Sequence, residues 1–305
     1  MSSLDESIMD KPTGELEQER VRAQFDRAAG RYDDHAFVQR EVAGRLDERF
    51  DLLKVAPQDI LDLGCGTGEM VQRMRRRYPK ARIWGLDLAH GMLCRMRGPS
   101  WTRWIPGRPA APGLVCADMH ALPFPGGRFD IVVSNLALQW SADPAQVFAE
   151  VQRLLRPGGV FMFTTLGPDT FLELRRAWRA VDEHPRVHDF FDMHDLGDAL
   201  VRSGLADPVM DVEQLTVTYE KLPVLLRDIR GLGAANARGD RARGLLTPRR
   251  YARFEAAYQD MAVAGGLPLR YEVVYGHAWG VGPVQKRQGD AVTVPLEMLK
   301  FNKKL

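Results

Sequence analysis

The feature that most constrains this chain is a glycine-rich loop that follows a short apolar run. Residues 60–63 read Ile-Leu-Asp-Leu, the loop reads Gly64-Cys65-Gly66-Thr67-Gly68, and a helix is expected to continue from it to about Tyr78. Glycines let the backbone turn sharply and let a ligand lie directly against its amides. The segment therefore predicts a strand, a ligand-binding loop and a helix in succession.

Short apolar runs and helical patterns alternate after this loop. Further strands are expected at residues 82–86, 114–117, 129–134 and 159–165, with helices between them. Five strands alternating with helices predict an α/β fold with a parallel sheet and right-handed crossovers. Two late strand-like runs, 214–219 and 271–279, bring the expected total to seven. We therefore predict a doubly wound, Rossmann-like sheet.

The order of these patterns divides the chain into five expected parts. Helical patterns precede the glycine loop, and a second helical stretch with glycine breaks separates the two late strands. The parts are a disordered N-terminus (1–15), an N-terminal helical cap (16–55), a Rossmann-like cofactor-binding core (56–220), a helical insertion serving as substrate lid (221–268), and the last strand with a C-terminal tail (269–305). Residues 98–113, with four prolines, are expected to form a structured loop.

Polar residues lie at or beside the ends of four successive predicted strands: Asp62, Asp87, Asp118 and Asn135. The carboxyl ends of parallel strands meet at one sheet edge, where such folds bind ligands. Asp87 lies at a position where a carboxylate can accept hydrogen bonds from ribose hydroxyls. Asp118 lies at a position where a carboxylate can accept an adenine amino hydrogen. Asp62 suits an ammonium group electrostatically. A dinucleotide loop has its third glycine one place later than here, so the spacing disfavours a dinucleotide-dependent oxidoreductase.

This ordered set of a GxGxG loop and polar strand ends resembles the class I S-adenosylmethionine-dependent methyltransferases. The resemblance implies their seven-stranded sheet and S-adenosyl-L-methionine as the cofactor. The residues expected to contact it are Tyr32, Asp62, Gly64, Cys65, Gly66, Thr67, Gly68, Asp87, Leu88, Asp118, Met119, Asn135 and Leu136.

Several segments are more specifically similar to the malonyl-acyl-carrier-protein O-methyltransferases of biotin synthesis, over about residues 22–280. These segments are Phe25 to Ala36 with Gln39, Ser134 to Trp140, Phe163 to Leu166 with Glu173-Leu174 and Ala177-Trp178, and Arg227 to Ala234 with Leu246-Thr247. The resemblance implies methylation of the free carboxylate of a malonyl thioester on acyl carrier protein or coenzyme A. The product is then accepted by fatty-acid enzymes.

A carboxylate is already ionised at pH 7, so this reaction needs no general base and we assign no catalytic acid or base. The substrate carboxylate does need a cationic partner. Arg227 and Arg230 are the first candidates, with Arg179 and Arg186 behind them, and Gln139 and Trp140 complete the expected substrate contacts.

A second interpretation stays open because the chain also resembles the mitochondrial complex I assembly factor of the same fold, regarded as an arginine hydroxylase. The similar segments are Asp195 to Gly197, Ser203 to Leu205, Gly276 to Gly280 and the tail 281–305. Among acidic residues, His184, His188 and His194 invite a metal interpretation. Pro185 argues against one helical face for the first two, and we expect no metal.

Composition excludes several other classes. The chain has 42 Lys and Arg against 40 Asp and Glu, so it is not expected to bind nucleic acid. Cys65, Cys94 and Cys116 form no CxxC pair, which disfavours a disulfide scaffold or zinc ribbon. The chain shows neither a membrane-spanning run nor a secretory signal, so we expect a cytoplasmic enzyme. The basic runs 75–77 and 249–250 are either solvated or dock an acidic carrier protein.

Overall fold

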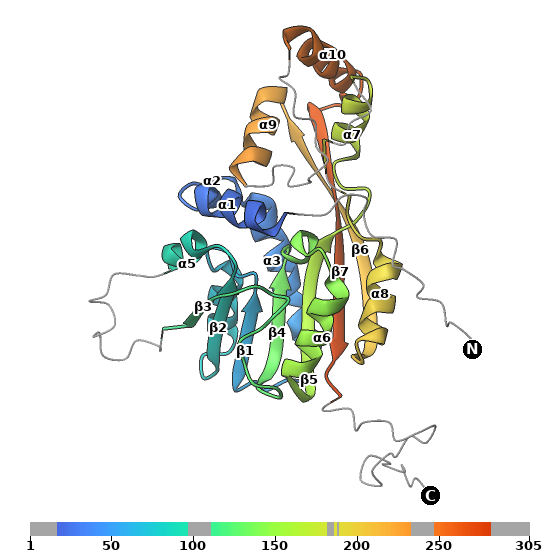
Figure 1. Ribbon diagram of the computed structural model, residues 1–305. Coiled ribbons are helices and arrows are strands. Elements are labelled where there is room, and N and C mark those ends of the chain that lie inside the picture. Colours follow the sequence, from blue (N-terminus) through green and yellow to red (C-terminus); the bar gives the residue numbers. More distant parts are fainter. Residues whose placement is uncertain (1–16, 97–110, 182–185, 188, 233–246, 282–305) are drawn as a thin grey trace, which may run out of the picture.

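The computed structural model describes residues 17–96, 111–181, 186–187, 189–232 and 247–281. It holds one seven-stranded sheet in the order β3-β2-β1-β4-β5-β7-β6 (Figure 1). The predicted α/β fold with a Rossmann-like sheet is confirmed. The predicted disordered N-terminus, most of the 98–113 loop and nearly all of the 281–305 tail lie outside the described residues.

The first five strands are parallel, as the alternation of strands and helices predicts. They are β1 (Asp59–Leu63), β2 (Arg82–Asp87), β3 (Gly113–Cys116), β4 (Phe129–Asn135) and β5 (Leu155–Leu166). The connecting helices are α4 (Glu69–Arg77), α5 (His90–Met96) and α6 (Pro144–Leu154). Every residue of β1 is buried, as expected for a central strand covered on both faces.

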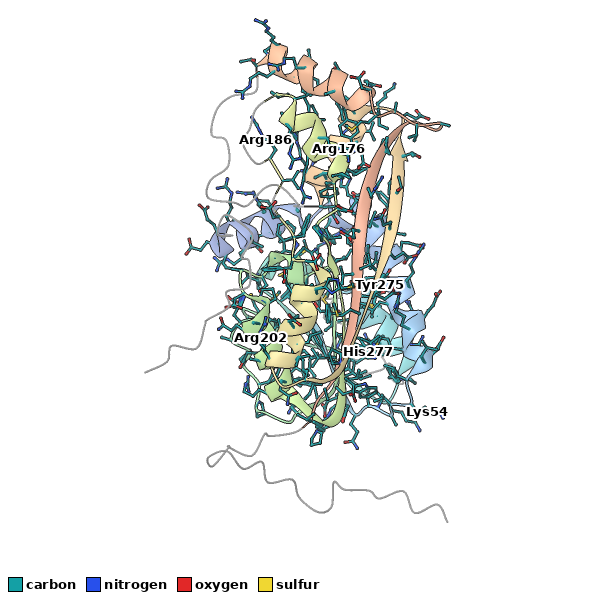
Figure 2. All side chains as sticks on the ribbon, turned by 90° about the vertical axis from the view of Figure 1, so that its right-hand side faces the viewer. Lys54, Arg176, Arg186, Arg202, Tyr275 and His277 are labelled. Atoms are coloured by element: carbon teal, nitrogen blue, oxygen red, sulfur yellow. The ribbon has the colours of Figure 1, made fainter. Side chains whose placement is uncertain are left out.

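The last two strands form a long antiparallel hairpin. β6 (Ala206–Tyr219) begins eight residues before the predicted run, and β7 (Leu267–Trp279) begins four residues before it. β7 pairs with β5 only over residues 273–279, whereas its residues 267–272 pair with β6 alone. The hairpin therefore extends past the carboxyl end of β5, as Figure 2 shows from the side.

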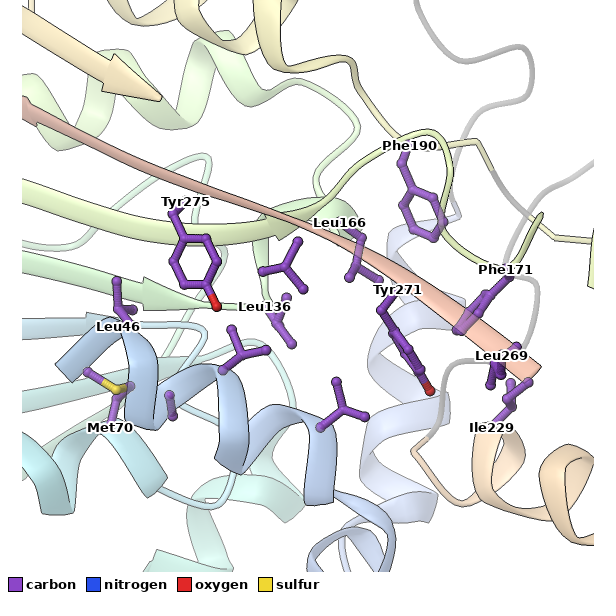
Figure 3. Close-up of a cluster of buried hydrophobic side chains, with 14 of the residues drawn as sticks. Leu46, Met70, Leu136, Leu166, Phe171, Phe190, Ile229, Leu269, Tyr271 and Tyr275 are labelled. Atoms are coloured by element: carbon purple, nitrogen blue, oxygen red, sulfur yellow. The ribbon is translucent and has the colours of Figure 1, made fainter. Parts of the chain in front are cut away.

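Helices cover both faces of the sheet and form two apolar layers. α3 (Phe37–Arg49) and α4 pack on one face, and α6 with α8 (Met193–Arg202) packs on the other. The first layer does not stop at the sheet edge. It continues from Leu46 and Met70 to Tyr271 and Ile229 on the extended hairpin and its helix (Figure 3). The core thus joins the sheet to the helices beyond it.

Three helices are gathered on the extended hairpin: α7 (Leu172–Arg179), α9 (Leu222–Gly231) and α10 (Pro248–Gln259). We call these three helices the lid. The ring of Trp178 on α7 stacks on that of Phe254 on α10, with centroids 4.0 Å apart and planes inclined by 17°. α9 and α10 lie within the predicted 221–268 insertion, whereas α7 follows β5.

The N-terminal cap comprises α1 (Gln18–Ala28), α2 (Tyr32–His35) and α3, followed by the short helix η1 (Phe50–Leu52). The amide of Gly91 on α5 donates to Asp26 Oδ1 at 2.7 Å, which ties α1 to the sheet edge. On the other side, His35 Nδ1 lies 2.9 Å from Asp228 Oδ1 of α9. The cap therefore contacts both the sheet and the lid.

Candidate cofactor and substrate site

The Gly64–Gly68 loop is held in a backbone conformation that favours glycine. Gly64, Gly66 and Gly68 have φ values of +74°, +53° and +96°. The amides of Gly64 and Cys65 both donate to the carbonyl of Leu86, at 2.8 and 2.9 Å, which fixes the loop against β2. A Cβ on Gly64 would lie 2.3 Å from Ala137 Cβ, whereas one on Gly66 would meet nothing within 4 Å. Gly66 therefore faces open space.

Two cavities meet at this loop, and Tyr32, Gly64, Gly66 and Asn135 line both of them. The first is about 650 Å³, open solvent at its mouth included, and lies beside the ends of β2 and β3. The second is about 810 Å³ on the same basis and lies between the loop and the cap. The predicted contact residues divide between them: Asp87, Leu88, Asp118, Met119, Leu136 and Trp140 line the first, and Asp62, Cys65 and Thr67 line the second.

Asp62 lines the second cavity as a buried carboxyl group. Its Oδ2 has no hydrogen-bond partner among the described residues. Burial, followed by the nearby charge of Asp87, raises the pKa of Asp62 to about 8, although the amide of Val71 favours the ionised form. An unpartnered buried carboxyl oxygen beside a cavity fits an ammonium group, because the cation would supply both the missing partner and the missing charge.

Asp87 ends β2 and lines the first cavity. Its two oxygens accept the amides of Gly66 and Ala89, each at 2.8 Å, so its orientation is fixed on both sides. Burial raises the pKa of Asp87, and these two amides oppose that rise. Each carboxylate oxygen keeps a further lone pair, so the group can still accept ligand hydroxyls.

Asp118 is held by a residue that the sequence analysis did not single out. His120 Nδ1 lies 2.6 Å from Asp118 Oδ1, and the His120 amide donates to the same oxygen at 2.9 Å. His120 Nε2 in turn lies 2.8 Å from the buried hydroxyl of Ser141. Asp118 Oδ2 is therefore the oxygen left for a ligand. Because Ser141 is 21 residues further along the chain, spacing alone gave no signal for this contact.

The turn after β4 is stabilised from β5. Leu136 has a φ of +47°, and its amide donates to Thr164 Oγ1 at 2.9 Å. The Thr164 hydroxyl donates to Asn135 Oδ1 at 2.9 Å, and Asn135 Nδ2 donates to the carbonyl of Gln39. The predicted substrate residue Gln139 is buried, and its Nε2 donates to the carbonyl of Leu136 at 2.7 Å. Gln139 therefore holds the strained turn.

The N-terminal cap closes the cavities through several side chains, only some of which were predicted to be site residues. Tyr32 lines both cavities, and burial raises the pKa of its hydroxyl. Phe25 meets Trp140 edge-to-face at 5.2 Å, and Gln18 Nε2 donates to the Trp140 carbonyl. Phe25 lies in the segment that carries the family resemblance, whereas nothing in the sequence pointed to Gln18.

Three of the predicted cofactor residues act mainly on the loop itself: Cys65, Thr67 and Gly68. The Thr67 hydroxyl donates to Asp33 Oδ1 of α2 at 2.6 Å, which links the loop to the cap. Cys65 is buried, and burial is the largest cause of the raised pKa of its thiol, which suits a packing role. Gly68 lies at the N-terminus of α4, where a Cβ would meet the side chain of Met96 at 2.7 Å.

The arginines predicted to hold the substrate carboxylate are on the lid. Arg227 and Arg230 lie on α9, and both are exposed and line neither cavity. Of the second-choice pair, Arg179 is exposed, and the Arg186 guanidinium lies 4.6 Å from the ring centroid of Trp178. Arg40 is a cationic side chain that lines the second cavity and was not predicted. Finding it required knowing how α3 lies against the loop.

Two further expectations concern the three histidines and a membrane-spanning segment. His194 lies in the first turn of α8, where its amide donates to Asp192, whereas His184 and His188 lie outside the described residues. In the part of the chain that is described, no three His, Cys, Asp or Glu side chains gather as a metal site would need. Within the same residues, no helix has the length and apolar character to cross a membrane.

Comparisons with known proteins agree with the fold and the loop. A family model described as a methyltransferase domain matches residues 61–163. The YcgJ protein of Bacillus subtilis has a similar fold, with a TM-score of 0.54 and 16% identity, covering 79% of this chain and 99% of its own. The sheet order with its antiparallel β7 and the glycine loop define a class I S-adenosylmethionine-dependent methyltransferase.

Closer relatives narrow the class to one family. The malonyl-[acyl-carrier protein] O-methyltransferase of Halorhodospira halophila is 47% identical over 281 residues, which are 91% of this chain and 93% of that protein. The protein of the same name from Laribacter hongkongensis is 48% identical over 276 residues, covering 90% of this chain and 93% of its own. The chain belongs to the malonyl-[acyl-carrier protein] O-methyltransferase family.

Proposed function

We propose that this chain uses S-adenosyl-L-methionine to methylate the free carboxylate of a malonyl thioester on acyl carrier protein, at the start of biotin synthesis. Family membership over nine tenths of the chain supports the reaction and the substrate. The observation that carries the cofactor site is the buried Asp62 carboxyl, with an unpartnered oxygen, beside the open face of Gly66. The proposal includes that the enzyme acts in the cytoplasm, together with its carrier-protein substrate.

The cofactor would extend across both cavities. Its ribose would lie on Asp87 and Leu88, and its adenine between Asp118 and Met119, in the first cavity. Its amino-acid end would enter the second cavity, where Asp62 suits the ammonium and Arg40 suits the carboxylate. Tyr32, Gly64, Gly66, Asn135 and the other loop residues would surround the sulfonium between these two ends.

When bound, S-adenosyl-L-methionine supplies a methyl group activated by its positively charged sulfur. Transfer of this methyl group to a malonyl carboxylate oxygen would break the carbon–sulfur bond, and its electron pair would stay on sulfur. No proton moves, because the carboxylate is ionised at pH 7. The chain therefore has to align the two groups and exclude water, a role for which the cap and the lid are suitably placed.

The arginine that holds the substrate carboxylate remains a prediction. Arg227 and Arg230 lie on α9, whose Asp228 contacts the cap at His35. A substrate that approaches the cavities past α9 would meet these guanidiniums first. Gln139 and Trp140 would act at the inner end of this path, Gln139 through the turn at Leu136 and Trp140 through the wall of the first cavity.

A steady-state assay with malonyl-acyl carrier protein tests the proposal directly, with formation of the methyl ester as the readout. We expect turnover by the parent and roughly fivefold to 150-fold weaker cofactor affinity in the Asp87→Ala variant, because about 1–3 kcal/mol of hydrogen bonding is lost. The chain should also restore growth without biotin to a cell that lacks its own malonyl-thioester methyltransferase. Cofactor binding without ester formation would instead favour the protein-modifying alternative.

A further inference from the structure

The lid helices have an unusual balance of charge for this chain. α7, α9 and α10 together contain eight arginines and three carboxylates. The whole chain has 42 basic and 40 acidic residues, so the remainder has 34 basic against 37 acidic residues. The positive charge is thus concentrated on three helices at one end of the molecule, as opposed to being spread over its surface.

Two of the three acidic side chains of the lid are engaged outside it. Glu173 is buried, and it accepts the amide of Arg270 on β7. Asp228 faces His35 of the cap at 2.9 Å. Glu255 is the remaining carboxylate on the three helices. Six lid arginines are exposed: Arg176, Arg179, Arg227, Arg230, Arg249 and Arg253.

Contacts between the helices hold the lid arginines at the same end of the molecule. Arg253 of α10 donates to the carbonyl of Ala180, at the end of α7, at 2.7 Å. Trp178 and Phe254, which stack on each other, join the same two helices. Burial raises the pKa of Tyr251 on α10, and the nearby charge of Arg230 on α9 opposes that rise, which places the two side chains close together. Figure 2 shows Arg176 and Arg186 at this end of the molecule.

The second basic run of the sequence is differently placed. Arg75, Arg76 and Arg77 end α4, which returns from the glycine loop toward the start of β2 at the opposite edge of the sheet. Arg77 is also engaged internally, since it donates to Asp47 and Asp51. This run is therefore remote from the cavities and partly neutralised, whereas the lid adjoins the cap that closes them.

We propose that the exposed arginines of α7 and α10 are the docking surface for the acyl carrier protein, which they recognise through a complementary cluster of carboxylates. The proposal rests on the function proposed above and assigns its partner a place on the molecule. Exposed arginines facing carboxylates raise the association rate and fix orientation. Docking there would place the carrier on the lid, whose α9 contacts the cap beside the cavities through Asp228 and His35.

The test compares two substrates that differ only in the carrier: malonyl-acyl carrier protein and malonyl-pantetheine. The docking variant is the double charge reversal Arg176→Glu with Arg249→Glu. Both residues are exposed and lie outside the cofactor site. The matched control, Arg76→Glu with Arg202→Glu, changes the net charge equally but on α4 and α8.

We expect kcat/KM for the carrier substrate to fall about tenfold or more in the docking variant and to stay near the parent value in the control, because reversed charges repel the carrier. Malonyl-pantetheine should react equally with all three proteins. Rising salt should reduce the rate with the carrier alone. A carrier with surface carboxylates changed to lysine should recover rate with the docking variant.

Equal kinetics of the docking variant and the control on the carrier substrate would overturn the proposal, as would an equal loss on both substrates. Binding of the carrier protein without its malonyl group separates this outcome from a failure of the proposed function. Suppose that the parent methylates neither substrate but binds the carrier, and that only the docking variant binds it at least tenfold more weakly. The docking surface would then be supported, and the proposed reaction would be wrong. Parent binding to nucleic acid in place of the carrier would overturn the surface assignment.

Discussion

Two glycines of the same loop have separable roles, one in folding and one in binding. Gly64→Ala places a Cβ 2.3 Å from Ala137 at a φ of +74°, so we expect it to lower the free energy of unfolding by roughly 2–5 kcal/mol. Gly66→Ala meets no protein atom within 4 Å, so only the backbone strain remains, roughly 1–2 kcal/mol. Its methyl group projects into the cavities and should weaken cofactor binding at least tenfold.

Denaturant unfolding and calorimetric titration of the two variants measure these effects side by side. The assignment of Gly66 to the cofactor site would be wrong if its alanine variant bound S-adenosyl-L-methionine like the parent. Loss of folding in Gly64→Ala leaves this comparison intact, because the two glycines are tested independently.

Asp62 predicts a pH dependence of cofactor binding. With its pKa raised to about 8, this carboxyl is protonated at pH 7 in the free protein. A bound ammonium favours the ionised form, so binding must release a proton below pH 8, and affinity should rise by up to about tenfold per pH unit. The window from pH 6 to 7.5 is the useful one, because α-amino groups themselves titrate near 7.7–8.0.

Calorimetry at pH 7 in two buffers of different ionisation enthalpy counts the released proton. The Asp62→Asn variant should bind more weakly, and its binding should release no proton from this position. A constant affinity across the window, with no proton released by the parent, would contradict the proposed contact between Asp62 and the ammonium.

The roles expected for Asp62 and Asp87 needed only their positions at strand ends beside a glycine loop. Parallel strands bring such residues to one edge, so local sequence was sufficient to place them. The contact of His120 with Ser141 and the place of Arg40 beside the loop depend instead on how distant elements pack together. No spacing along the chain encodes those contacts.

At the scale of elements, the contact between α9 and α2 joins the lid to the cap. Gly231→Ala would place a Cβ 2.1 Å from His35 Cδ2, which must force the two helices apart and disturb the pairing of His35 with Asp228. We expect a destabilisation of roughly 1–3 kcal/mol and faster amide hydrogen exchange in α9. Hydrogen exchange followed by mass spectrometry measures this locally.

Gly197→Ala in α8 is the matched control, because the nearest atom to its added Cβ is Met210 Cγ at 3.8 Å, an ordinary contact. This variant should leave exchange in α9 unchanged and stabilise α8 slightly, since alanine favours helix more than glycine does. Equal exchange in α9 for the two variants would show that Gly231 does not maintain the junction.

The central strands were predicted closely, whereas the start of β6 was not. Residues 206–212 do alternate, with half-buried Ala206, Pro208, Met210 and Val212 on one side, but Pro208 and its neighbour Asp207 argue against a strand in sequence. Their strand conformation comes from pairing with β7, which supplies the hydrogen bonds. β5 likewise begins at Leu155 because that residue pairs with Phe129, although Pro157, Gly158 and Gly159 read as a turn.

For the molecule as a whole, the sequence contained the seven strands and the class of cofactor, but not how the lid is assembled. The predicted insertion, 221–268, includes α9 and α10 and leaves out α7, which follows β5. Composition could not group these segments because α7 and α10 are joined only by tertiary contacts such as the stacking of Trp178 on Phe254.

That two-part assembly restricts how the lid can be exchanged between enzymes of this fold. The segment matched as a methyltransferase domain ends at residue 163, before any lid helix begins. A chimera that receives a foreign segment between β6 and β7 alone would keep Trp178 without its stacking partner, leaving apolar surface uncovered. Recombination that preserves the lid must transfer α7 together with the β6–β7 hairpin, so the region after β5 is inherited as a single unit.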